Sequence, residues 1–269
     1  MRDHHSLVTR LMSRLLPRRG TQSPAAVAIA RPAAEDRLYV VGDVHGRLDL
    51  LEVMLRKIVA DFAFRVSDGR RPKVILLGDI IDRGDQSRDV VEKLRSSTGK
   101  GPLGEVTVLM GNHEAALLQF LSTPERGANW LRFGGMQTLA SYGVSIPAGT
   151  LDATAYQNLA ARLRAAMGNH LEFLRNLPLA YRSGDVLCVH AGVDPAHPDG
   201  RDEDNVLWGK ARFPETGPVE GLRVVHGHYD APEPVVTDGR ICVDTGAYYT
   251  GQLTAVRLDQ DTGIIVAET

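Results

Sequence analysis

The stretch Leu38–Gly46, with the sequence LYVVGDVHG, constrains the fold of this chain more than any other. It begins with four apolar residues, a run typical of a buried strand, and Gly42 ends that run. Asp43 and His45 therefore lie at the end of the strand, where an α/β sheet normally carries its chemistry. A carboxylate and an imidazole two residues apart can both turn toward one ion. Alone, however, this pattern is more typical of an ordinary loop, so its meaning depends on the strands that follow.

The same order of strand, loop and helix recurs downstream of this stretch. Apolar residues at helical spacing predict helices over 47–61 and 87–96, and apolar runs predict strands over 73–77 and 106–110. The first of these strands runs into GDIIDRG and the second into GNHE. Such a repeat is typical of right-handed βαβ crossovers, so we expect an α/β fold with a largely parallel sheet.

The chain changes character in its second half. The stretch 115–180 has helical spacing interrupted by glycine and proline, which predicts a helical insertion or cap over the edge of the sheet. Strand signals then return in short segments: 186–189, 222–225, 233–237, 241–243, 252–258 and 264–267. They predict a second, mainly antiparallel sheet, so the domain over 37–269 is expected to hold two sheets with helices outside them.

Composition excludes several classes of protein. With 269 residues, 43% of them hydrophobic, the chain can bury one good core. No run approaches the roughly 20 apolar residues of a membrane span. The net charge of −2 gives no general attraction to nucleic acid. Cys188 and Cys242 lie in apolar runs without metal-site spacing, so we expect free, buried thiols in a cytoplasmic protein.

Residues 1–36 are predicted to be a flexible, basic N-terminal arm. Seven arginines and only three acidic residues occur before residue 38, and no strand signal is present there. Leu7, Leu11 and Leu15 recur at helical spacing, so residues 1–20 could make a weak contact with a membrane surface or a partner. The arginines are not interleaved with aromatic residues, which argues against a nucleic-acid partner.

Metal-binding residue types gather at the predicted strand ends. Five of the nine histidines follow a strand in this way: His45, His113, His190, His226 and His228. Asp43, Asp79 and Asn112 occupy similar positions. Carboxylate, amide and imidazole ligands suit Mn²⁺, with Fe or Zn²⁺ as alternatives, and the set is large enough for two divalent metal ions.

The order of these residues suggests how they divide between the ions. We expect one ion to be held by Asp43 and His45, and the other by Asn112, His190 and His228. Asp79 is central in the order and is the natural bridge, because a carboxylate can bind two ions at once. Water shared by the two ions would be acidified to hydroxide near neutral pH.

The motifs also carry a family resemblance. GDVHG, GDIIDRG, GNHE, LCVHAGV and VVHGHYD, in this order, resemble the signature of the phosphoprotein phosphatase (PPP) family of calcineurin-like binuclear metallophosphoesterases. The resemblance covers roughly residues 38–258, and WLRFGG is similar to a segment of the bacterial and phage serine/threonine phosphatases. It implies an αββα sandwich of two mixed β-sheets flanked by helices, with two bound metal ions.

The same resemblance implies further catalytic roles. His113 would be the general acid that protonates the leaving oxygen, and Asp82 would keep it protonated. Arg83 would grip the phosphate oxygens, for which guanidinium geometry is suited. The nucleophile would be the hydroxide held between the metal ions.

Two places depart from the family pattern and leave alternatives open. Lys210 stands where a second phosphate-binding arginine is usual, and Arg212, two residues on, could take that role instead. His226 replaces the usual aromatic or apolar residue before Gly-His, so either His226 or His228 could be the last ligand; we favour His228.

Four other polar residues are expected to be structural or exposed. Asp244 follows a strand and is expected to support its loop, and Glu114 suits a helix start because its charge complements the helix dipole. His170 and His197 lie in polar or proline-rich surroundings and are expected to be exposed.

We therefore expect a metal-dependent phosphoesterase that acts on phosphomonoesters, including phosphoserine and phosphothreonine on proteins. The alternatives are symmetrical hydrolysis of dinucleoside tetraphosphates and a non-catalytic phosphoprotein-binding module. A deep pocket with aromatic residues would favour a nucleotide, and an open groove would favour a peptide. Trp130, Arg132 and Phe133 are candidate pocket residues in the insertion.

Overall fold

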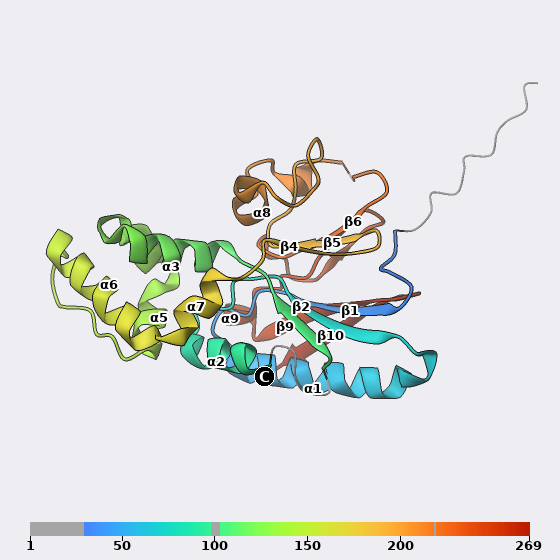
Figure 1. The fold of residues 1–269 in the computed structure, drawn as a ribbon, viewed down its shortest axis with the longest axis horizontal. Coiled ribbons are helices and arrows are strands. Elements are labelled where there is room, and N and C mark those ends of the chain that lie inside the picture. The colour runs from blue at the N-terminus through green and yellow to red at the C-terminus, as the bar shows by residue number, and fades with distance from the viewer. Residues whose placement is uncertain (1–29, 98–102, 218) are drawn as a thin grey trace, which may run out of the picture.

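The computed structural model describes residues 30–97, 103–217 and 219–269, which form two β-sheets packed face to face with helices outside them (Figure 1). The predicted arm lies almost wholly outside the described residues. The first strand, β1, begins at Asp36, next to the domain boundary predicted from the sequence. In the described ranges no helix is both long and apolar enough to cross a membrane.

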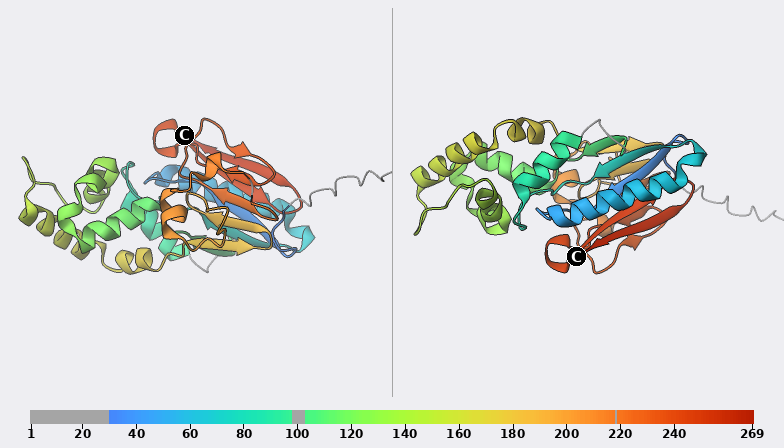
Figure 2. Two further views of the ribbon diagram at one scale, coloured as in Figure 1. Left: turned by 90° about the horizontal axis from the view of Figure 1, so that it is seen from above. Right: turned by 90° about the horizontal axis from the view of Figure 1, so that it is seen from below.

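The first sheet is mixed and has the strand order β10-β9-β1-β2-β3. Its strands are β1 (Asp36–Val41), β2 (Arg71–Leu76), β3 (Glu105–Val108), β9 (Gln252–Leu258) and β10 (Thr262–Glu268). β1, β2 and β3 are parallel, whereas β9 is antiparallel to both of its neighbours. Helices α1 (Leu48–Arg65) and α2 (Ser87–Ser97) connect the parallel strands and cover the outer face (Figures 1 and 2). The predicted βαβ pattern is confirmed.

The second sheet is also mixed and has the strand order β4-β5-β6-β8-β7. Its strands are β4 (Ala180–Ser183), β5 (Val186–Val189), β6 (Arg223–His226), β7 (Val235–Val236) and β8 (Arg240–Cys242). β5, β6 and β8 are parallel, and β4 and β7 are antiparallel edge strands. The short helix α8 (Glu203–Trp208) lies on the outer side of this sheet, which completes the αββα order of layers (Figure 1).

Two expectations about the C-terminal strands are wrong. The second sheet is mixed rather than mainly antiparallel, and β9 and β10 belong to the first sheet. Both sheets offer an apolar inner face, so an apolar strand pattern does not show which sheet a strand joins. A further strand, β4, was not predicted, because its four-residue sequence AYRS carries little apolar signal.

Alternation along β1 builds the core on both faces of the first sheet. Leu38 and Val40 belong to the apolar layer between the two sheets. Tyr39 and Val41 point the other way and pack in the layer that includes α1. All four side chains are fully buried, which explains why this strand reads as a continuous apolar run in the sequence.

The insertion predicted to be helical is helical, and it projects from one end of the two sheets (Figure 2). It consists of α3 (Asn112–Ser122), α4 (Ala128–Trp130), a π-helical turn (Leu131–Gly135), α5 (Met136–Ser141), α6 (Ala153–Met167) and α7 (Asn169–Arg175). Its apolar side chains join the same core as α1 and α2. The insertion is therefore packed against the sheet that carries the first three motifs.

His170 contradicts the sequence-based expectation because it is buried. Its Nδ1 lies 2.8 Å from the hydroxyl of Tyr142, and its Nε2 lies 2.7 Å from a carboxylate oxygen of Glu92 in α2. The polar neighbours along the sequence gave no sign of these partners, which lie in α2 and directly after residue 141. His197 is exposed, as expected.

Arg37 carries a charge buried at the end of the sheet opposite the motifs. Only 1% of Arg37 is exposed, and its guanidinium pairs with Asp68 and, at 2.7 Å, with Asp259, whose side chain is 5% exposed. It also donates to the carbonyl oxygen of Arg65 at the end of α1. This side chain therefore ties β1, α1 and the turn after β9 together.

Replacement of Arg37 by Met is expected to lower the free energy of unfolding by about 3 kcal/mol, because it leaves buried carboxylate charge without its partner. Urea unfolding followed by circular dichroism measures this loss. Arg71→Met is the matched control, since the pair of Arg71 with Glu35 is exposed and is expected to contribute less than about 1 kcal/mol. Equal losses in the two variants would contradict the assignment.

Candidate metal centre and active site

The predicted metal ligands converge at the carboxyl ends of the strands, although they come from five separate motifs. Asp43 and His45 follow β1, Asp79 follows β2, and Asn112 begins α3 after β3. His190 and His228 follow β5 and β6 of the second sheet. The two sheets thus meet at one site, as parallel strands with common polarity require.

Asp79 is the centre of this site. Its carboxylate belongs to two groups of potential ligand atoms, each with atoms within 4.8 Å of one another: His45, Asp79 and His113, and Asp79, His190 and His228. Asp79 Oδ2 lies 3.7 Å from His45 Nε2 and 3.5 Å from His190 Nε2. A carboxylate between two groups of imidazoles can bridge two ions, as the sequence predicted.

Asn112 and Asp43 complete the set. The amide oxygen of Asn112 lies 2.8 Å from His190 Nε2 and 3.0 Å from His228 Nδ1. The carboxylate of Asp43 is buried and accepts a hydrogen bond from the backbone N–H of His228. All six predicted ligands are therefore brought together.

The protonation of these groups also suits divalent ions. Burial lowers the pKa of His45 to about 3 and that of His228 to about 4, and it lowers the pKa of His190 as well. The imidazoles are consequently neutral near pH 7, the form that binds metal. Burial, together with the charges of Asp244 and Asp79, raises the pKa of Asp43, so a cation nearby would compensate a costly negative charge. The residues present fit a two-metal site.

Two motif glycines make room for the carboxylates. A Cβ atom at Gly111 would collide with Oδ1 of Asp79, and one at Gly227 would collide with Oδ1 of Asp43. The glycines of GNHE and HGH are thus required because a ligand oxygen occupies the space that any side chain would take.

Backbone strain is concentrated at the site. Among the described residues, six non-glycine residues have positive φ angles, and five of them surround the centre: His45 (45°), Asp79 (48°), Asp82 (68°), Arg83 (67°) and His228 (65°). Side chains rarely adopt this conformation, which costs free energy unless the surroundings enforce it. The loops are therefore held by contacts beyond their own sequence.

Glu114 supplies the most important of those contacts. Its buried carboxylate accepts hydrogen bonds from four backbone N–H groups, those of Asp79 (2.8 Å), Ile80 (3.0 Å), Ile81 (3.3 Å) and Gly111 (2.9 Å). Burial and the neighbouring Asp79 raise the pKa of this carboxyl, while the N–H donors favour its charged form. The expected structural role of Glu114 at the start of a helix is confirmed. In addition, its hydrogen bonds hold the loop after β2 against α3, which the sequence did not predict.

His113 and Asp82 form a hydrogen-bonded pair beside the metal ligands. His113 Nδ1 lies 2.7 Å from Asp82 Oδ2, and Asp82 is completely buried. Burial acts to lower the pKa of His113, but the carboxylates of Asp79 and Asp82 outweigh it and hold the pKa above its usual value. A proton is thus available at His113, as a general acid requires.

Arg83 is oriented toward the same imidazole. Its Nη2 lies 3.2 Å from His113 Nε2, and its guanidinium stacks on the ring of Tyr248 in α9 (Ala247–Thr250), 4.8 Å from the ring centroid. Arg83 Nη2 donates to Nε2 in this arrangement, so Nδ1 carries the proton that is donated to Asp82. The predicted phosphate-binding arginine therefore lies beside the predicted general acid.

The structure distinguishes the two histidines of HGH. His228 lies among the candidate ligands, whereas His226 is buried against Phe213 and Tyr229. The ring of His226 donates from Nδ1 to the carbonyl oxygen of Gly227, and its Nε2 has no described partner. The geometry therefore favours His228, in agreement with the sequence-based preference.

The candidates for a second phosphate-binding cation lie away from the centre. Lys210 is exposed and pairs with Asp204, and Arg212 is exposed and pairs with Glu215. Neither lines the cavity described below. Their predicted role would require both side chains to leave these partners.

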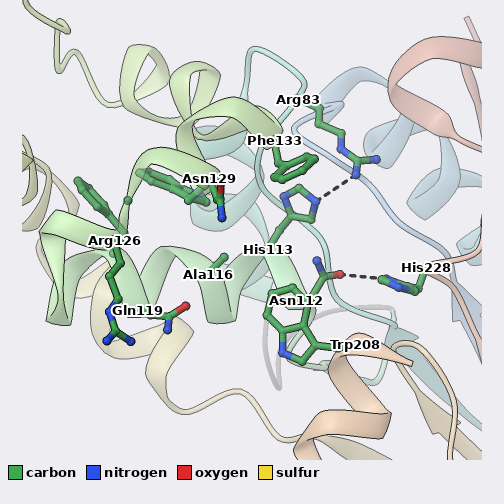
Figure 3. A pocket seen from close by; sticks show the side chains of 13 residues that line it. Arg83, Asn112, His113, Ala116, Gln119, Arg126, Asn129, Phe133, Trp208 and His228 are labelled. Carbon is green, nitrogen blue, oxygen red and sulfur yellow. Dashed lines mark hydrogen bonds between the residues drawn. The ribbon is translucent and has the colours of Figure 1, made fainter. Parts of the chain in front are cut away.

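A cavity of about 740 Å³ opens beside the metal ligands and extends along α3 into the insertion (Figure 3). It is lined in part by Arg83, Asn112, His113, Gln119, Arg126, Asn129, Phe133 and Trp208. Phe133 and Trp208 are unusually exposed for aromatic residues, at 63% and 44%, and lie on opposite sides of His113 and Asn112 in Figure 3. Trp130, also predicted from this segment, lines the cavity as well, whereas Arg132 is exposed and does not line it.

The sequence did not predict several contacts that hold the site in place. Trp130 and Thr138, both from the insertion, hydrogen-bond to the carboxylate of Asp82, and Ser87 accepts a hydrogen bond from its backbone N–H. The WLRFGG motif was the only feature of the sequence that pointed to this segment, and it did not indicate Asp82 as the residue that the segment contacts. Asp244 supports its own loop, as expected, by accepting from the N–H of Gly246.

The fold and the site define a class: an αββα metallophosphoesterase with a histidine–aspartate pair beside a two-metal ligand set. Residues 36–264 match the family described as calcineurin-like phosphoesterase, and the chain belongs to that family. It is accordingly a hydrolase of the metallophosphoesterase type, from a metal-dependent family.

Two curated relatives span most of the chain. The bis(5'-nucleosyl)-tetraphosphatase PrpE [asymmetrical] of Oceanobacillus iheyensis is 27% identical over 86% of this chain and 92% of its own length. The symmetrical bis(5'-nucleosyl)-tetraphosphatase of Methylococcus capsulatus is 23% identical over 82% of this chain and 91% of its own length.

Solved structures show the same fold. A protein proposed to be a diadenosine tetraphosphatase has a TM-score of 0.55 and 21% identity over 88% of this chain and 95% of that chain. A cold-active protein-tyrosine phosphatase from Shewanella has a TM-score of 0.53 and 16% identity over 87% of this chain and 82% of that chain. The calcineurin-like family is thus confirmed, whereas the serine/threonine phosphatase branch receives no specific support.

Glu114→Ala is expected to abolish tight metal binding, because four backbone N–H groups lose their acceptor and the loop that carries Asp79 is released. The free energy of unfolding should fall by about 3 kcal/mol or more, since each unpaired buried donor costs about 1–3 kcal/mol. Elemental analysis of the purified variant and thermal unfolding measure the two effects. Glu125→Ala, at an exposed residue of the insertion, is the control, and full metal content in Glu114→Ala would contradict this role of Glu114.

His226→Leu is expected to preserve metal content, whereas His228→Leu is expected to lower it. Elemental analysis of the two purified variants measures this difference.

His226→Leu should also change the stability of the protein in acid. Burial lowers the folded-state pKa of His226 to about 3, below the usual value of 6.5, so the unfolded state alone takes up this proton as the pH falls from about 6.5. The wild type should therefore lose up to about 1.4 kcal/mol more stability per pH unit than His226→Leu between pH 6 and pH 4. Urea unfolding at several pH values tests this, and parallel curves would exclude it.

Proposed function

We propose that this chain hydrolyses dinucleoside polyphosphates, with bis(5'-nucleosyl)-tetraphosphates as the preferred substrates. The single observation that carries the proposal is the pair of exposed aromatic side chains, Phe133 and Trp208, at a cavity of about 740 Å³ that begins at the candidate metal ligands. Aromatic faces stack on nucleobases with little regard to sequence, and they are costly to expose without such a ligand. The relatives named as bis(5'-nucleosyl)-tetraphosphatases support the same substrate class.

The polar lining of the cavity fits a nucleotide as well. Arg83 and Arg126 are its charged side chains among the described lining residues, and Gln119 and Asn129 add carboxamides. A polyphosphate carries several negative charges that guanidinium groups bind well, and carboxamides can read a base edge. A phosphoprotein, the main sequence-based expectation, would be better served by a shallow open groove.

The residues of the centre suggest a mechanism. Asp43, His45, Asp79, Asn112, His190 and His228 would hold two divalent metal ions, with Mn²⁺ as the expected metal. When bound, such ions activate water for attack and neutralise phosphate charge. Arg83 would grip the phosphate oxygens of the substrate, which withdraws its guanidinium from His113 Nε2. Once free, Nε2 can take up a proton from solvent, and Asp82 stabilises the positive charge of the resulting imidazolium. His113 then delivers the Nε2 proton to the leaving oxygen and returns to its neutral form with Nδ1 still protonated.

The state of the cysteines fits a reducing compartment. Cys188 and Cys242 are both buried and free, as the sequence predicted. Cytoplasmic hydrolysis of a nucleotide is consistent with this chemistry.

The Mn²⁺-loaded protein is expected to hydrolyse diadenosine tetraphosphate with a higher kcat/KM than a phosphothreonine peptide. His113→Asn should reduce both activities by roughly 100-fold or more, as expected for loss of a general acid. Separation of the products decides the cleavage position, because two ADP molecules indicate symmetrical cleavage and ATP with AMP indicates asymmetrical cleavage. Preference for the peptide would overturn the proposal, and metal binding without any turnover would favour the non-catalytic alternative.

Phe133→Ala and Trp208→Ala should each raise KM for the dinucleotide by about 5-fold to 100-fold, because base stacking contributes about 1–3 kcal/mol per base. Phe64→Ala is the matched control, since Phe64 is 86% exposed at the end of α1 and does not line the cavity. An unchanged KM in both cavity variants would show that these rings do not bind the bases.

A further inference from the structure

We infer that Trp130 and Thr138 of the insertion are positioning residues that hold Asp82, and through it the general acid His113, in the catalytic arrangement. The inference deepens the proposed function and rests on it for the choice of substrate. It assigns a catalytic purpose to a segment that otherwise forms only the wall of the cavity.

The contacts to Asp82 are direct and buried. The indole Nε1 of Trp130 donates to Asp82 Oδ2 at 2.9 Å, the same oxygen that lies 2.7 Å from His113 Nδ1. The hydroxyl of Thr138 donates to the other oxygen, Oδ1, at 2.5 Å and accepts from the backbone N–H of Asp82 at 3.0 Å. Both oxygens of the carboxylate are thus fixed by side chains of the insertion.

These hydrogen-bond donors offset the unfavourable burial of the Asp82 carboxylate. The residue is completely buried, and burial raises the pKa of its carboxyl, which disfavours the charged form that His113 requires. Hydrogen bonds from His113, Thr138 and Trp130 act in the opposite direction. A hydrogen bond to a charged group is typically stronger than one between neutral groups, so the insertion stabilises the carboxylate as well as its orientation.

The backbone of the insertion is shaped for this contact. In the π-helical turn after Trp130, Gly134 has a φ of +120°, and its carbonyl oxygen accepts from the N–H of Arg83 at 3.3 Å. A Cβ at Gly134 would collide with Arg83, and one at Gly135 would approach the ring of Trp130 closely. Phe133 and Gly134 both have non-helical backbone angles, so the chain kinks at this point. The two glycines therefore let the turn lie directly against the Asp82–Arg83 loop.

Trp130 is itself held firmly. Its ring stacks on Phe120 of α3 with a centroid distance of 4.8 Å, and only 4% of the residue is exposed. Because α3 also begins with Asn112 and His113, the indole is fixed relative to the group whose partner it holds. Orientation of this kind is what catalysis needs from groups that do not touch the substrate.

The test compares four variants in hydrolysis of diadenosine tetraphosphate. Thr138→Val and Trp130→Phe remove the donors but keep similar shapes, and each should lower kcat by about 10-fold to 100-fold with little change in KM or metal content. Thr138→Ser keeps the hydroxyl and should restore most of kcat. Ser141→Ala removes a hydroxyl from the same helix that bonds to Thr138 O and Arg88 N, away from Asp82, and should behave as wild type.

A double variant separates positioning from a general structural role. In His113→Asn/Thr138→Val the second change should add no further loss of kcat, because Thr138 acts only through His113. The inference would be overturned if the double variant lost kcat by the product of the two single losses, or if Thr138→Val lost its metal.

A proton NMR measurement keeps the inference testable without turnover. In the Zn²⁺-loaded protein, the downfield Nδ1–H signal that disappears in His113→Asn should shift or broaden in Thr138→Val and Trp130→Phe but not in Ser141→Ala. A signal that stays unchanged in the first two variants would refute positioning. Wild-type protein that does not hydrolyse the dinucleotide would refute the proposed function instead, and the NMR result would still decide the role of Trp130 and Thr138.

Discussion

The site depends on one set of interactions: the carboxylate of Glu114 accepts hydrogen bonds from four backbone N–H groups. It fixes the loop after β2 against the start of α3, and so sets Asp79 relative to Asn112 and His113. Strained backbone at Asp79 persists because these bonds over-determine it. A metal centre assembled from separate strand ends needs such a fixed reference, since each ligand loop alone would relax to a less strained conformation.

The insertion provides the second level of support. Its helices share a core with the first sheet, and its π-helical turn contacts the loop that carries Asp82 and Arg83. The same segment presents Phe133 to the cavity. Under the proposed function, one short stretch of chain serves both substrate recognition and orientation of the general acid, and this accounts for glycines where helix propensity alone would disfavour them.

Much of this could be predicted from the sequence because the ligands follow strands, and strands reveal themselves by apolar runs. The parallel half of the first sheet and the six candidate ligands, which the fold brings close together, were predicted in this way. The sheet to which β9 and β10 belong was not, because strand pairing is a long-range property that a local pattern does not encode. The partners of His170, Glu114 and Asp82 were missed for the same reason: each lies many residues away in sequence, and only packing brings it near.

The position of β9 has a consequence for biosynthesis. β1, which precedes Asp43 and His45, is hydrogen-bonded on one side to β2 and on the other to β9, more than 200 residues later. During translation β1 therefore emerges long before its second neighbour, and domains fold as units once their contacts are available. The nascent chain cannot complete the first sheet until β9 has left the ribosome, and it cannot bring His228 next to Asp43 before residue 228 has emerged. The candidate ligands from the two sheets are consequently brought together only after both sheets have been synthesised.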